Sequence, residues 1–442
     1  MSERTFVGGI HPSYFKENTA GIPIAPARAP SQVIIPLQQN IGAPCEAIVQ
    51  VGDTVKVGQK IGEPKGFVSA PIFASVSGKV SKIEPFNHSM GMPVLAIFIE
   101  NDGQDTPCED MKPNKSLEEL EPKEIVAISK DAGLVGLGGA TFPTHVKLSP
   151  PPEIQIDTVI INGAECEPFL TADHRLMVER ADDVVFGLKA FMKALGATRG
   201  VIGVEDNKPD AISSMQKAVA EGSEGYNIEV HPLHTKYPQG AEKMLIKATT
   251  GREVPPGALP MAVNVVNQNS GTAIALAEAI KLGKPLYERV VTVTGPGINK
   301  PGNFVVRNGT LIRDIIEQCG GLTDDARKLI LGGPMMGFAQ PTDEIPAIKG
   351  TSGVLILTEK FVKEQPIAAC IKCGKCVEVC PMNLLPSFIG SASEKKLFDL
   401  AEKYGAMDCF ECGCCTYTCP AKRPLVQWIR IAKGTIAASR KK

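Results

Sequence analysis

The residues with the clearest chemistry are cysteines near the C-terminal end of the chain. The spacing Cys-x2-Cys-x2-Cys-x3-Cys-Pro occurs twice, at Cys370, Cys373, Cys376 and Cys380, and again at Cys409, Cys412, Cys415 and Cys419. This spacing is typical of two 4Fe-4S clusters, where the fourth cysteine of each run binds the other cluster. We therefore expect one cluster on Cys370, Cys373, Cys376 and Cys419, and its neighbour on Cys409, Cys412, Cys415 and Cys380. Two neighbouring clusters carry single electrons.

Two other uses of cysteine agree less well with this pattern. Zinc takes four ligands, typically as two separated pairs, whereas here a threefold run with a trailing Cys-Pro is found twice. A disulfide framework is typical of short secreted chains, but this chain is long and its cysteines are concentrated at one end. We treat Cys414 as a non-ligand because Cys415 keeps the interval of three. The scattered cysteines receive no ligand role: Cys45, Cys108, Cys166 and Cys319.

Length and composition indicate a multidomain protein of a reducing compartment. The chain has 442 residues, 43% of them hydrophobic, which predicts about three domains with sizeable cores. The net charge of −1 gives no overall case for binding nucleic acid or an anionic surface. No apolar run approaches the roughly 18 residues that span a bilayer, and no apolar signal region follows Met1. We expect a cytoplasmic protein without a transmembrane segment.

The last residues form a local exception to the balanced charge. Residues 422–442 contain seven Lys and Arg residues and no acidic residue. Their apolar positions Leu425, Trp428, Ile429 and Ile431 are compatible with one helical face. A solvated basic helix is the ordinary interpretation, and docking on an integral membrane partner or on anionic lipid is the alternative.

The first domain, residues 1–103, is predicted to be rich in β-structure. Apolar and polar residues alternate around turn glycines at 51–61, and a similar alternation with turn signals is found at 67–83. The pattern resembles the barrel-sandwich domains that carry lipoyl or biotinyl groups. The position of their modified lysine falls near Phe67, where no lysine stands, so we expect the scaffold without the swinging arm. The polar, acidic residues 104–123 indicate a linker.

Residues 124–286 alternate predicted strands and helices. Short apolar strands are expected at 156–161, 200–204 and 227–230, with a helical stretch at 175–195. This alternation predicts a parallel sheet with covered faces. Ligands of such sheets lie at the carboxyl ends of the strands.

Two loops fall where such a ligand would be held. In the first, Gly136, Gly138 and Gly139 expose backbone N–H groups, Phe142 offers a flat apolar face, and Lys147 a cation for phosphate. A glycine-rich loop alone is weak evidence, and a plain turn is the default interpretation.

The second loop, residues 162–168, follows the first predicted strand directly. It reads Asn-Gly-Ala-Glu-Cys-Glu-Pro, so one amide and two carboxylates offer acceptors for ribityl or ribose hydroxyls and ring N–H groups. If Asn162 and Glu165 only capped a turn, Glu167 would have no purpose. Together, the two loops favour a nucleotide or flavin site.

Both loops resemble the flavin-binding loops of the NADH-oxidising flavoprotein subunit of respiratory complex I. Residues 237–242 are similar to that family's Tyr-x-x-Gly-Glu-Glu segment, and residues 268–272 to its Asn-Asn-x-Glu-Thr segment. Ala164 and Ala241 replace acidic residues of the relative. These departures concern the fine hydrogen bonding to flavin and nucleotide.

Over nearly its full length the chain resembles the RnfC family, subunits of the Rnf electron transport complex. The resemblance runs from residue 8 to the second cysteine run and includes a β-grasp, soluble-ligand-binding stretch at about 289–357. It implies a multidomain α/β protein with β modules. The expected order is a barrel-sandwich domain (1–103), linker (104–123), FMN/NADH domain (124–286), β-grasp module (287–360), ferredoxin-like domain with two 4Fe-4S clusters (361–424) and basic tail (425–442).

The resemblance implies the NAD(H)-exchanging end of a membrane-bound ferredoxin:NAD oxidoreductase that transports Na⁺ or H⁺. NADH gives two electrons together as a hydride, whereas each iron–sulfur cluster accepts one electron at a time. A flavin is therefore needed between them. No acid or base residue is needed for hydride transfer. The expected partners are the other subunits of the complex, ferredoxin and NADH, at the cytoplasmic face of the membrane. By resemblance, FMN is assigned Gly136, Gly138, Gly139, Lys147, Asn162, Glu165, Gln268, Asn269 and Thr272, and the nicotinamide nucleotide Phe142, Glu167, Tyr237 and Glu242.

Two alternatives remain open at this point. A soluble corrinoid reductase resembles the same family in its flavin region and cysteine runs, but its domain order differs. A flavin-free electron relay is the alternative of a different class, and Ala164 and Ala241 are the residues that favour it. The sequence leaves open the direction of electron flow and the coupling ion.

Overall fold

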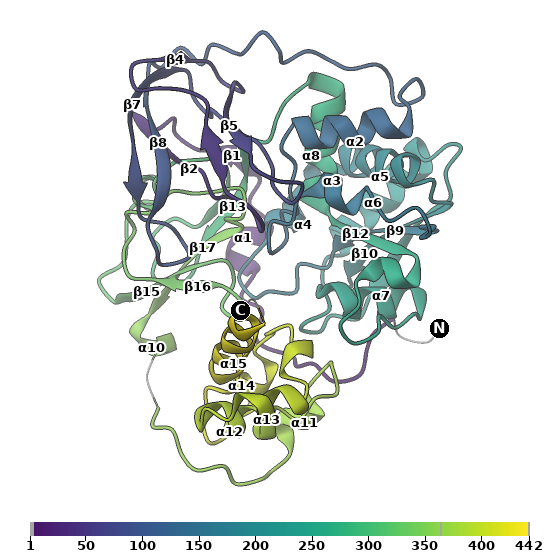
Figure 1. Ribbon diagram of the computed structural model, residues 1–442, viewed down its shortest axis with the longest axis vertical. Coiled ribbons are helices and arrows are strands. Elements are labelled where there is room, and N and C mark those ends of the chain that lie inside the picture. The colour runs from purple at the N-terminus through teal and green to yellow at the C-terminus, as the bar shows by residue number, and fades with distance from the viewer. Residues whose placement is uncertain (1–3, 363–364, 441–442) are drawn as a thin grey trace.

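The computed structural model describes residues 4–362 and 365–440 (Figure 1). Its N-terminal part contains two small antiparallel sheets, ordered β2-β8-β7-β4 and β3-β5-β6. Alternate side chains such as Val33, Ile35 and Ile61 point between the sheets and form one core. The expected barrel-sandwich is thus confirmed. Its strands are β2 (Gln32–Pro36), β3 (Cys45–Ala47), β4 (Thr54–Val55), β5 (Lys60–Pro64), β6 (Ile72–Phe73), β7 (Gly78–Phe86) and β8 (Val94–Asn101).

The first residues run outside this sandwich. After helix α1 (Glu17–Ala20), strand β1 (Ile24–Pro26) pairs in parallel with β14 (Gly302–Arg307) of a distant module. Earlier still, Ile10 forms an isolated bridge with Tyr237. The N-terminal segment therefore ties together parts of the chain that are remote in sequence.

The predicted α/β domain has a parallel sheet in the order β11-β10-β9-β12. Val159 and Ile161 face the larger group of helices, whereas Ile160 faces α7, as alternation along a strand requires. Helices thus cover both faces (Figure 1). The elements are α2 (Pro122–Asp131), α3 (Thr144–Lys147), β9 (Thr158–Gly163), α4 (Ala172–Glu179), α5 (Ala181–Leu195), β10 (Arg199–Glu205), α6 (Pro209–Gly222), β11 (Ile228–Leu233), α7 (Glu242–Thr250), η1 (Pro260–Val263), β12 (Val265–Asn269) and α8 (Ser270–Leu282).

Two elements of this domain differ from the sequence prediction. The helical stretch expected at 175–195 is broken at Arg180, whose φ of −132° and ψ of 34° are not helical. Acidic residues then open α5, where Asp182 and Asp183 are favourable in the first turn. Strand β12 was not predicted, because its C-terminal half is polar although it is buried. Burial of polar residues in a strand is itself a feature that needs an explanation.

The β-grasp module contributes a six-stranded sheet ordered β1-β14-β13-β17-β15-β16. Helix α9 packs on it through Ile312, Ile315 and Ile316. Lys349 joins this module to the other two domains, since its buried Nζ donates to the carbonyls of Pro71 and Gly133, both at 2.7 Å. The remaining elements are β13 (Glu288–Thr294), α9 (Ile312–Gln318), β15 (Ala326–Leu331), β16 (Phe338–Gln340), β17 (Gly353–Thr358) and α10 (Glu359–Val362).

The C-terminal domain is a small helical unit at the bottom of the view (Figure 1). Its core includes Ile389, Ala401, Ile429 and Ile436, so the basic C-terminal helix α15 packs inside the domain. Ile431 is 57% exposed and does not share the buried face of Ile429. The elements are α11 (Lys375–Glu378), α12 (Pro386–Glu394), α13 (Phe398–Lys403), η2 (Ala406–Asp408), α14 (Cys414–Thr418) and α15 (Leu425–Ser439).

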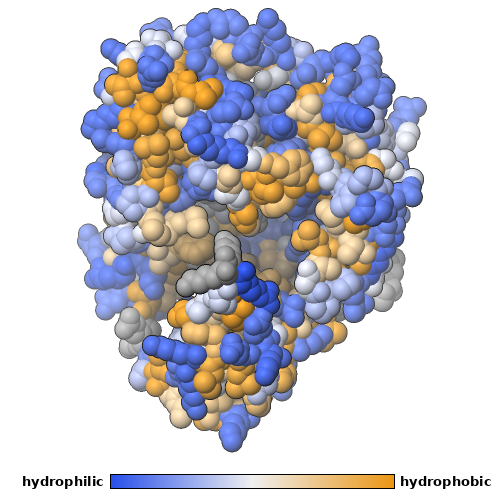
Figure 2. Space-filling view, viewed as in Figure 1, coloured by the Kyte–Doolittle hydropathy of each residue, from blue (hydrophilic) through white to orange (hydrophobic). Residues whose placement is uncertain are grey.

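The surface of the molecule is mixed on the face shown in Figure 2. Hydrophobic side chains gather over the barrel-sandwich, over parts of the α/β domain and over the cysteine-containing domain, interspersed with hydrophilic residues. Within the ranges that the structure describes, no helix has the length and apolar character required to cross a membrane.

Candidate redox sites

The carboxyl ends of all four parallel strands meet at one edge of the α/β sheet. In the register of β9 and β12, Asn162 lies opposite Asn269 and Ile161 opposite Gln268. The loop that follows β9 and the segment that follows β11 reach the same edge, where the Asn162 side chain donates to the carbonyl of Gly240 at 2.8 Å. This is where open parallel sheets bind their ligands. Three loops that are distant in sequence are thus brought together.

The glycine-rich loop rests against this edge. The Leu137 N–H donates to Thr272 Oγ1 at 3.0 Å. A Cβ added at Gly138 would lie 2.7 Å from the Asn269 side-chain nitrogen, so only glycine allows this approach. A Cβ at Gly139 would meet nothing within 4 Å, which leaves open space above the loop. The loop therefore combines close packing below with room for a ligand above.

Lys147 and Glu242 form an ion pair at the same edge. Lys147 Nζ lies 2.8 Å from Glu242 Oε2 and donates to the carbonyl of Asn267 at 3.0 Å. Both side chains are partly exposed, at 26% and 35%. We expected Lys147 to offer a cation for phosphate and Glu242 to contact the nicotinamide nucleotide. In the structure, the two side chains contact each other.

The Glu165 side chain connects the loop after β9 to the first turn of helix α4. Its φ is 45°, a left-handed conformation that is uncommon for a residue with a side chain. Its carboxylate accepts the N–H groups of Asp173 at 2.8 Å and His174 at 3.1 Å, in the first turn of α4. Such a carboxylate is favourable at a helix N-terminus.

Buried lysines hold the backbone of this loop from behind. Lys208 Nζ donates to the Ala164 carbonyl at 2.6 Å and pairs with Glu205 at 3.0 Å. Lys16 Nζ donates to the Glu165 carbonyl at 2.7 Å, and burial lowers its pKa. These contacts preorganise the loop.

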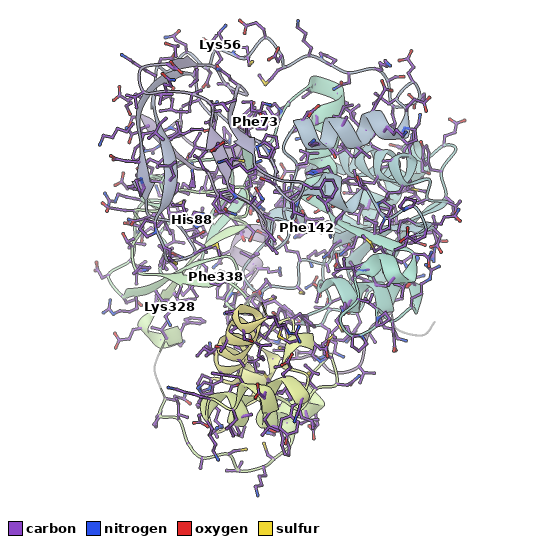
Figure 3. The ribbon with its side chains drawn as sticks, viewed as in Figure 1. Lys56, Phe73, His88, Phe142, Lys328 and Phe338 are labelled. Carbon is purple, nitrogen blue, oxygen red and sulfur yellow. The ribbon has the colours of Figure 1, made fainter. Side chains whose placement is uncertain are left out.

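Glu167 lies in the loop after β9 and Tyr237 in the segment after β11, and the polar atoms of both side chains bond to other parts of the chain. The Glu167 carboxylate accepts backbone N–H groups of Met335 and Met336, at 3.0 and 2.9 Å. The buried Tyr237 hydroxyl donates to the carbonyl of Cys412 at 2.8 Å. Both residues, which we expected beside the nicotinamide, thus direct their polar atoms toward the β-grasp module and the cysteine domain. Phe142 lies between the α/β domain and the β modules (Figure 3).

The residues at the sheet edge fit FMN. Among the residues that the structure describes, Gln268 Nε2 is buried without a hydrogen-bond partner, as expected of an atom that binds a polar ligand. The N-terminus of α8 begins at the same edge, and its backbone N–H groups and dipole favour an anion such as the FMN phosphate. These features account for the polar burial in β12.

Some residues of the edge were not expected from the sequence. Asp173 accepts from Asn269 Nδ2 at 2.7 Å, and burial together with Glu165 raises its pKa to about 6. Gln239 is fully buried, and neither polar atom of its side chain finds a partner within the described ranges. A perturbed carboxylate and an unpaired amide at a ligand edge are candidate contacts. Neither has a local sequence signal, because only the fold brings them here.

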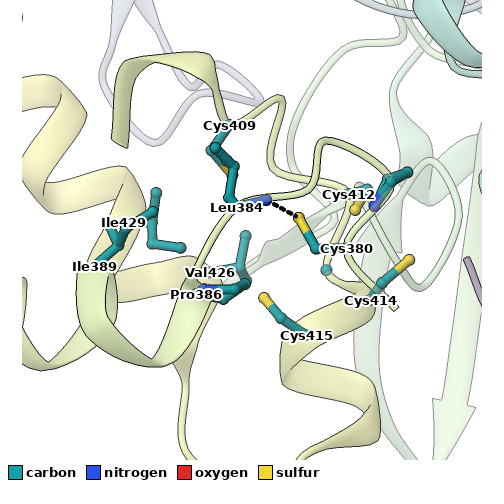
Figure 4. Close-up of a pocket in the computed structure, with 12 residues that line it drawn as sticks. Cys380, Leu384, Pro386, Ile389, Cys409, Cys412, Cys414, Cys415, Val426 and Ile429 are labelled. Carbon is teal, nitrogen blue, oxygen red and sulfur yellow. Dashed lines mark hydrogen bonds between the residues drawn. The ribbon is translucent and has the colours of Figure 1, made fainter. Parts of the chain in front are cut away.

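The second cysteine run surrounds a cavity in the C-terminal domain (Figure 4). Cys409, Cys412 and Cys415 line it together with Cys380 from the first run, and apolar residues such as Ile389 and Val426 close it. Burial raises the pKa of Cys409 to about 11 in the free thiol form. Four thiols in an apolar cavity suit a cuboidal cluster, which takes one thiolate per iron. Cys414 also lines the cavity and is fully buried.

The first cysteine run repeats the backbone of the second. Lys372 and Gly374 have φ values of 56° and 81°, and the corresponding Glu411 and Gly413 have 66° and 82°. Each run then enters a short helix, α11 or α14. Cys370 and Cys373 are exposed, whereas Cys376 and Cys419 are partly buried. The equivalent loops fit two clusters of the same type, and the first run lies nearer the surface.

Comparison with protein families assigns each part of the chain. Residues 4–104 match the RnfC barrel sandwich hybrid domain, residues 129–278 the Nuo51 FMN-binding domain, residues 290–339 the SLBB domain and residues 369–422 the 4Fe-4S dicluster domain. The chain is therefore an electron-transfer flavoprotein with FMN and iron–sulfur clusters as its cofactors. Zinc sites and a flavin-free relay do not agree with these matches.

Relatives of known name cover almost the entire chain. The C subunit of the Na(+)-translocating ferredoxin:NAD(+) oxidoreductase complex of Acetobacterium woodii is 52% identical, over 99% of this chain and 98% of its own. The corresponding subunit of the proton-translocating complex of Clostridium ljungdahlii is 49% identical over 98% and 94%, and that of the ion-translocating oxidoreductase complex of Rhodobacter capsulatus 42% over 97% and 83%. The chain belongs to the RnfC family, the C subunits of ion-translocating ferredoxin:NAD(+) oxidoreductase complexes. This full-length match decides against a corrinoid reductase.

A solved structure with a partly similar fold is an NAD+-reducing [NiFe]-hydrogenase in the air-oxidized state. It is 20% identical, with a TM-score of 0.49, and the match covers 65% of this chain and 55% of that chain.

Proposed function

We propose that this protein takes hydride from NADH at the edge of its parallel sheet and delivers the electrons singly to ferredoxin through the cysteine domain. The observation that carries the proposal is the contact between the two sites, where the Tyr237 hydroxyl donates to the Cys412 carbonyl at 2.8 Å. When bound, FMN supplies the conversion between hydride and single electrons. The reverse direction, from ferredoxin to NAD⁺, uses the same residues.

The residues of the sheet edge would bind and orient the flavin. Asn162, Gln268 and Asn269 offer amide groups, Thr272 anchors the glycine-rich loop through the Leu137 N–H, and Gly136, Gly138 and Gly139 provide close backbone approach. Phe142 and Glu242 would face the nicotinamide nucleotide, and Lys147, whose Nζ lies 2.8 Å from Glu242 Oε2, would offer a cation to the FMN phosphate. No side chain has to move a proton, because hydride leaves NADH with both electrons.

The cysteines would divide between two clusters by crossing over. Cys380, Cys409, Cys412 and Cys415 share one cavity, which supports their assignment to one cluster. Cys370, Cys373, Cys376 and Cys419 would hold the other, nearer the surface. The surface cluster would be the one that faces ferredoxin or another redox subunit.

The place of the protein would be the cytoplasmic face of the membrane, bound to the integral membrane subunits of its complex. The reducing environment that free thiolate ligands require supports this side. The names of the relatives include both Na⁺ and H⁺ transport, and this chain does not decide between the ions.

The test is anaerobic. The purified chain should contain about eight irons for two 4Fe-4S clusters, with one FMN, and NADH should bleach the flavin and reduce the clusters. Cluster loading without flavin binding, even after incubation with FMN, would refute the proposed NADH site. Flavin bleaching without cluster reduction would refute the proposed path between the two sites.

A further inference from the structure

Glu167 lies where three parts of the chain meet. Its carboxylate accepts the Met335 N–H at Oε2, 3.0 Å away, and the Met336 N–H at Oε1, 2.9 Å away. Both methionines lie between β15 and β16, in a segment of residues 332–337 that we call the methionine loop. Hydrogen bonds from two N–H groups to one carboxylate are strong. The loop after β9 is thereby fixed to the β-grasp module.

The methionine loop is shaped around this carboxylate. A Cβ added at Gly333 would lie 2.1 Å from Glu167 Oε2, well inside contact distance. A Cβ at Gly337 would lie 2.4 Å from the carbonyl oxygen of Gly333. The two glycines therefore allow the loop to fold tightly enough to present its N–H groups.

Tyr237 forms a second connection from the same place. Its side chain is fully buried, and its hydroxyl donates to the Cys412 carbonyl at 2.8 Å while lying 3.5 Å from Glu167 Oε1. Cys166, Cys412 and Cys414 pack in the same small core as the Tyr237 ring. The connection thus runs from the flavin-side loop to the backbone of the second cysteine run.

The methionine loop reaches the same cysteine run from the other side. The Met335 carbonyl lies 3.2 Å from the position that a Cβ would take at Gly413, where φ is 82°. The Arg430 guanidinium of α15 lies over the Phe338 ring of β16, 5.6 Å from its centre. The hydrogen bond from Tyr237 and the contact from Met335 therefore converge on residues 412–413.

We propose that Glu167 and Tyr237 are positioning residues for electron transfer, which hold the second cysteine run at a fixed separation from the flavin-side loop. The inference rests on the proposed function and gives these residues a different role from nucleotide contact. Because the rate of electron transfer falls steeply with the separation of the two centres, a looser junction slows the step between flavin and cluster. The two residues act through the methionine loop and the Cys412 backbone.

The test compares two rates in the full chain loaded with FMN and clusters. After rapid anaerobic mixing with NADH, flavin bleaching and cluster reduction are followed separately in Tyr237→Phe and Glu167→Ala. We expect the ratio of the cluster rate to the flavin rate to fall by roughly threefold to tenfold, the effect of one lost hydrogen bond on a docking equilibrium. Glu167→Gln keeps one acceptor oxygen and should recover part of the loss.

A third variant perturbs the junction from the β-grasp side. Gly333→Ala pushes a methyl group into the Glu167 carboxylate and should lower the same ratio. Its matched control is Gly21→Ala, at a position with φ −91° where a Cβ meets nothing within 4 Å. A lower ratio in Gly21→Ala as well would overturn the assignment to this junction.

Hydrogen exchange supplies a readout that does not depend on activity. The amides of residues 335 and 336 should exchange faster in Glu167→Ala than in the unmutated chain, whereas those of β9 should not. The proposal would be overturned if the amides of residues 335 and 336 exchanged at the same rate in Glu167→Ala as in the unmutated chain. It would also be overturned if the variants slowed only flavin bleaching, which would return Glu167 to the nucleotide site. Failure of NADH to bleach the unmutated chain would refute the proposed function instead, and the exchange rates would still decide whether the junction exists.

Discussion

Cys380 lines the same cavity as Cys409, although the two residues belong to different cysteine runs. Helix α11 ends at Glu378, two residues before Cys380, and the N–H of Leu384 donates to Cys380 Sγ at 3.4 Å (Figure 4). Hydrogen bonds to cluster sulfurs are among the features that set reduction potentials. The cavity therefore gives the crossed assignment a direct test.

Substitution of the fourth cysteines should reveal the crossing. Cys380→Ala and Cys409→Ala are expected to lose the same cluster, because both residues line one cavity. Each variant should retain about four of eight irons and lack the same electron paramagnetic resonance signal. Cys419→Ala should lose the other signal, together with Cys370→Ala. The crossed assignment fails if Cys380→Ala and Cys370→Ala lose the same signal.

A methyl group at position 138 should weaken flavin binding. Gly138→Ala places a Cβ 2.7 Å from the Asn269 side-chain nitrogen, so either the glycine-rich loop or Asn269 must move. We expect the FMN dissociation constant to rise about tenfold, which corresponds to about 1.4 kcal/mol. Fluorescence titration of the flavin-depleted chain measures it. Gly434→Ala, on α15 with nothing within 4 Å, is the control and should bind FMN normally.

Removal of the buried amine behind the flavin-side loop should destabilise the domain. Lys208→Met removes the amine that pairs with the buried Glu205 carboxylate, which keeps only a long hydrogen bond from the Lys236 N–H at 3.3 Å, and frees the Ala164 carbonyl. Breaking such a buried pair costs about 3–5 kcal/mol, and urea unfolding measures the loss. The double variant Lys208→Met/Glu205→Leu should recover much of it, because no charge is then buried alone.

An exposed ion pair is the matched control for this experiment. Lys115 and Glu124 lie 2.8 Å apart with side chains 61% and 39% exposed. Lys115→Met should leave the midpoint of urea unfolding almost unchanged, because ion pairs between exposed side chains contribute little to stability. Equal losses in Lys208→Met and Lys115→Met would contradict a structural role for the buried pair.

Stability should rise with pH in a window set by Lys349. Burial lowers the pKa of this amine from 10.5 to about 7, so between these values the unfolded chain binds a proton that the folded chain does not. Stability contributed by Lys349 therefore increases as the pH rises from about 7 toward 10.5. Below pH 7 the amine is charged in both states and the unfavourable contribution is constant.

Lys349→Met should remove this dependence. It should also lower stability by about 1–3 kcal/mol, since the Pro71 and Gly133 carbonyls lose their buried donor. Thermal midpoints at pH 7 and pH 9 measure both effects, with the exposed Lys112→Met as the control. Parallel pH slopes in the unmutated chain and in Lys349→Met would show that the amine does not titrate in this window.

Several features followed from local patterns in the sequence. Alternation of apolar and polar residues predicted a β-rich first domain because side chains in β-strands repeat every two residues. The barrel-sandwich followed from the resemblance of this pattern to domains that carry lipoyl or biotinyl groups. The loops around Gly138 and Asn162 were identified because each follows a recognisable element. Strand β12 escaped prediction because Asn267 and Gln268 are polar, although the strand is buried.

From the sequence alone, the spacing of the cysteines predicted the iron–sulfur clusters, because one short loop must wrap one cluster. The resemblance to known families implied FMN and the order of the domains. The direction of side chains at the contacts between domains depends on how the domains pack against each other. Glu167 and Tyr237 lie in flavin-side loops, yet their hydrogen bonds go to Met335, Met336 and Cys412. Such partners are remote in sequence, and no local pattern encodes a contact that forms only when separate modules pack together.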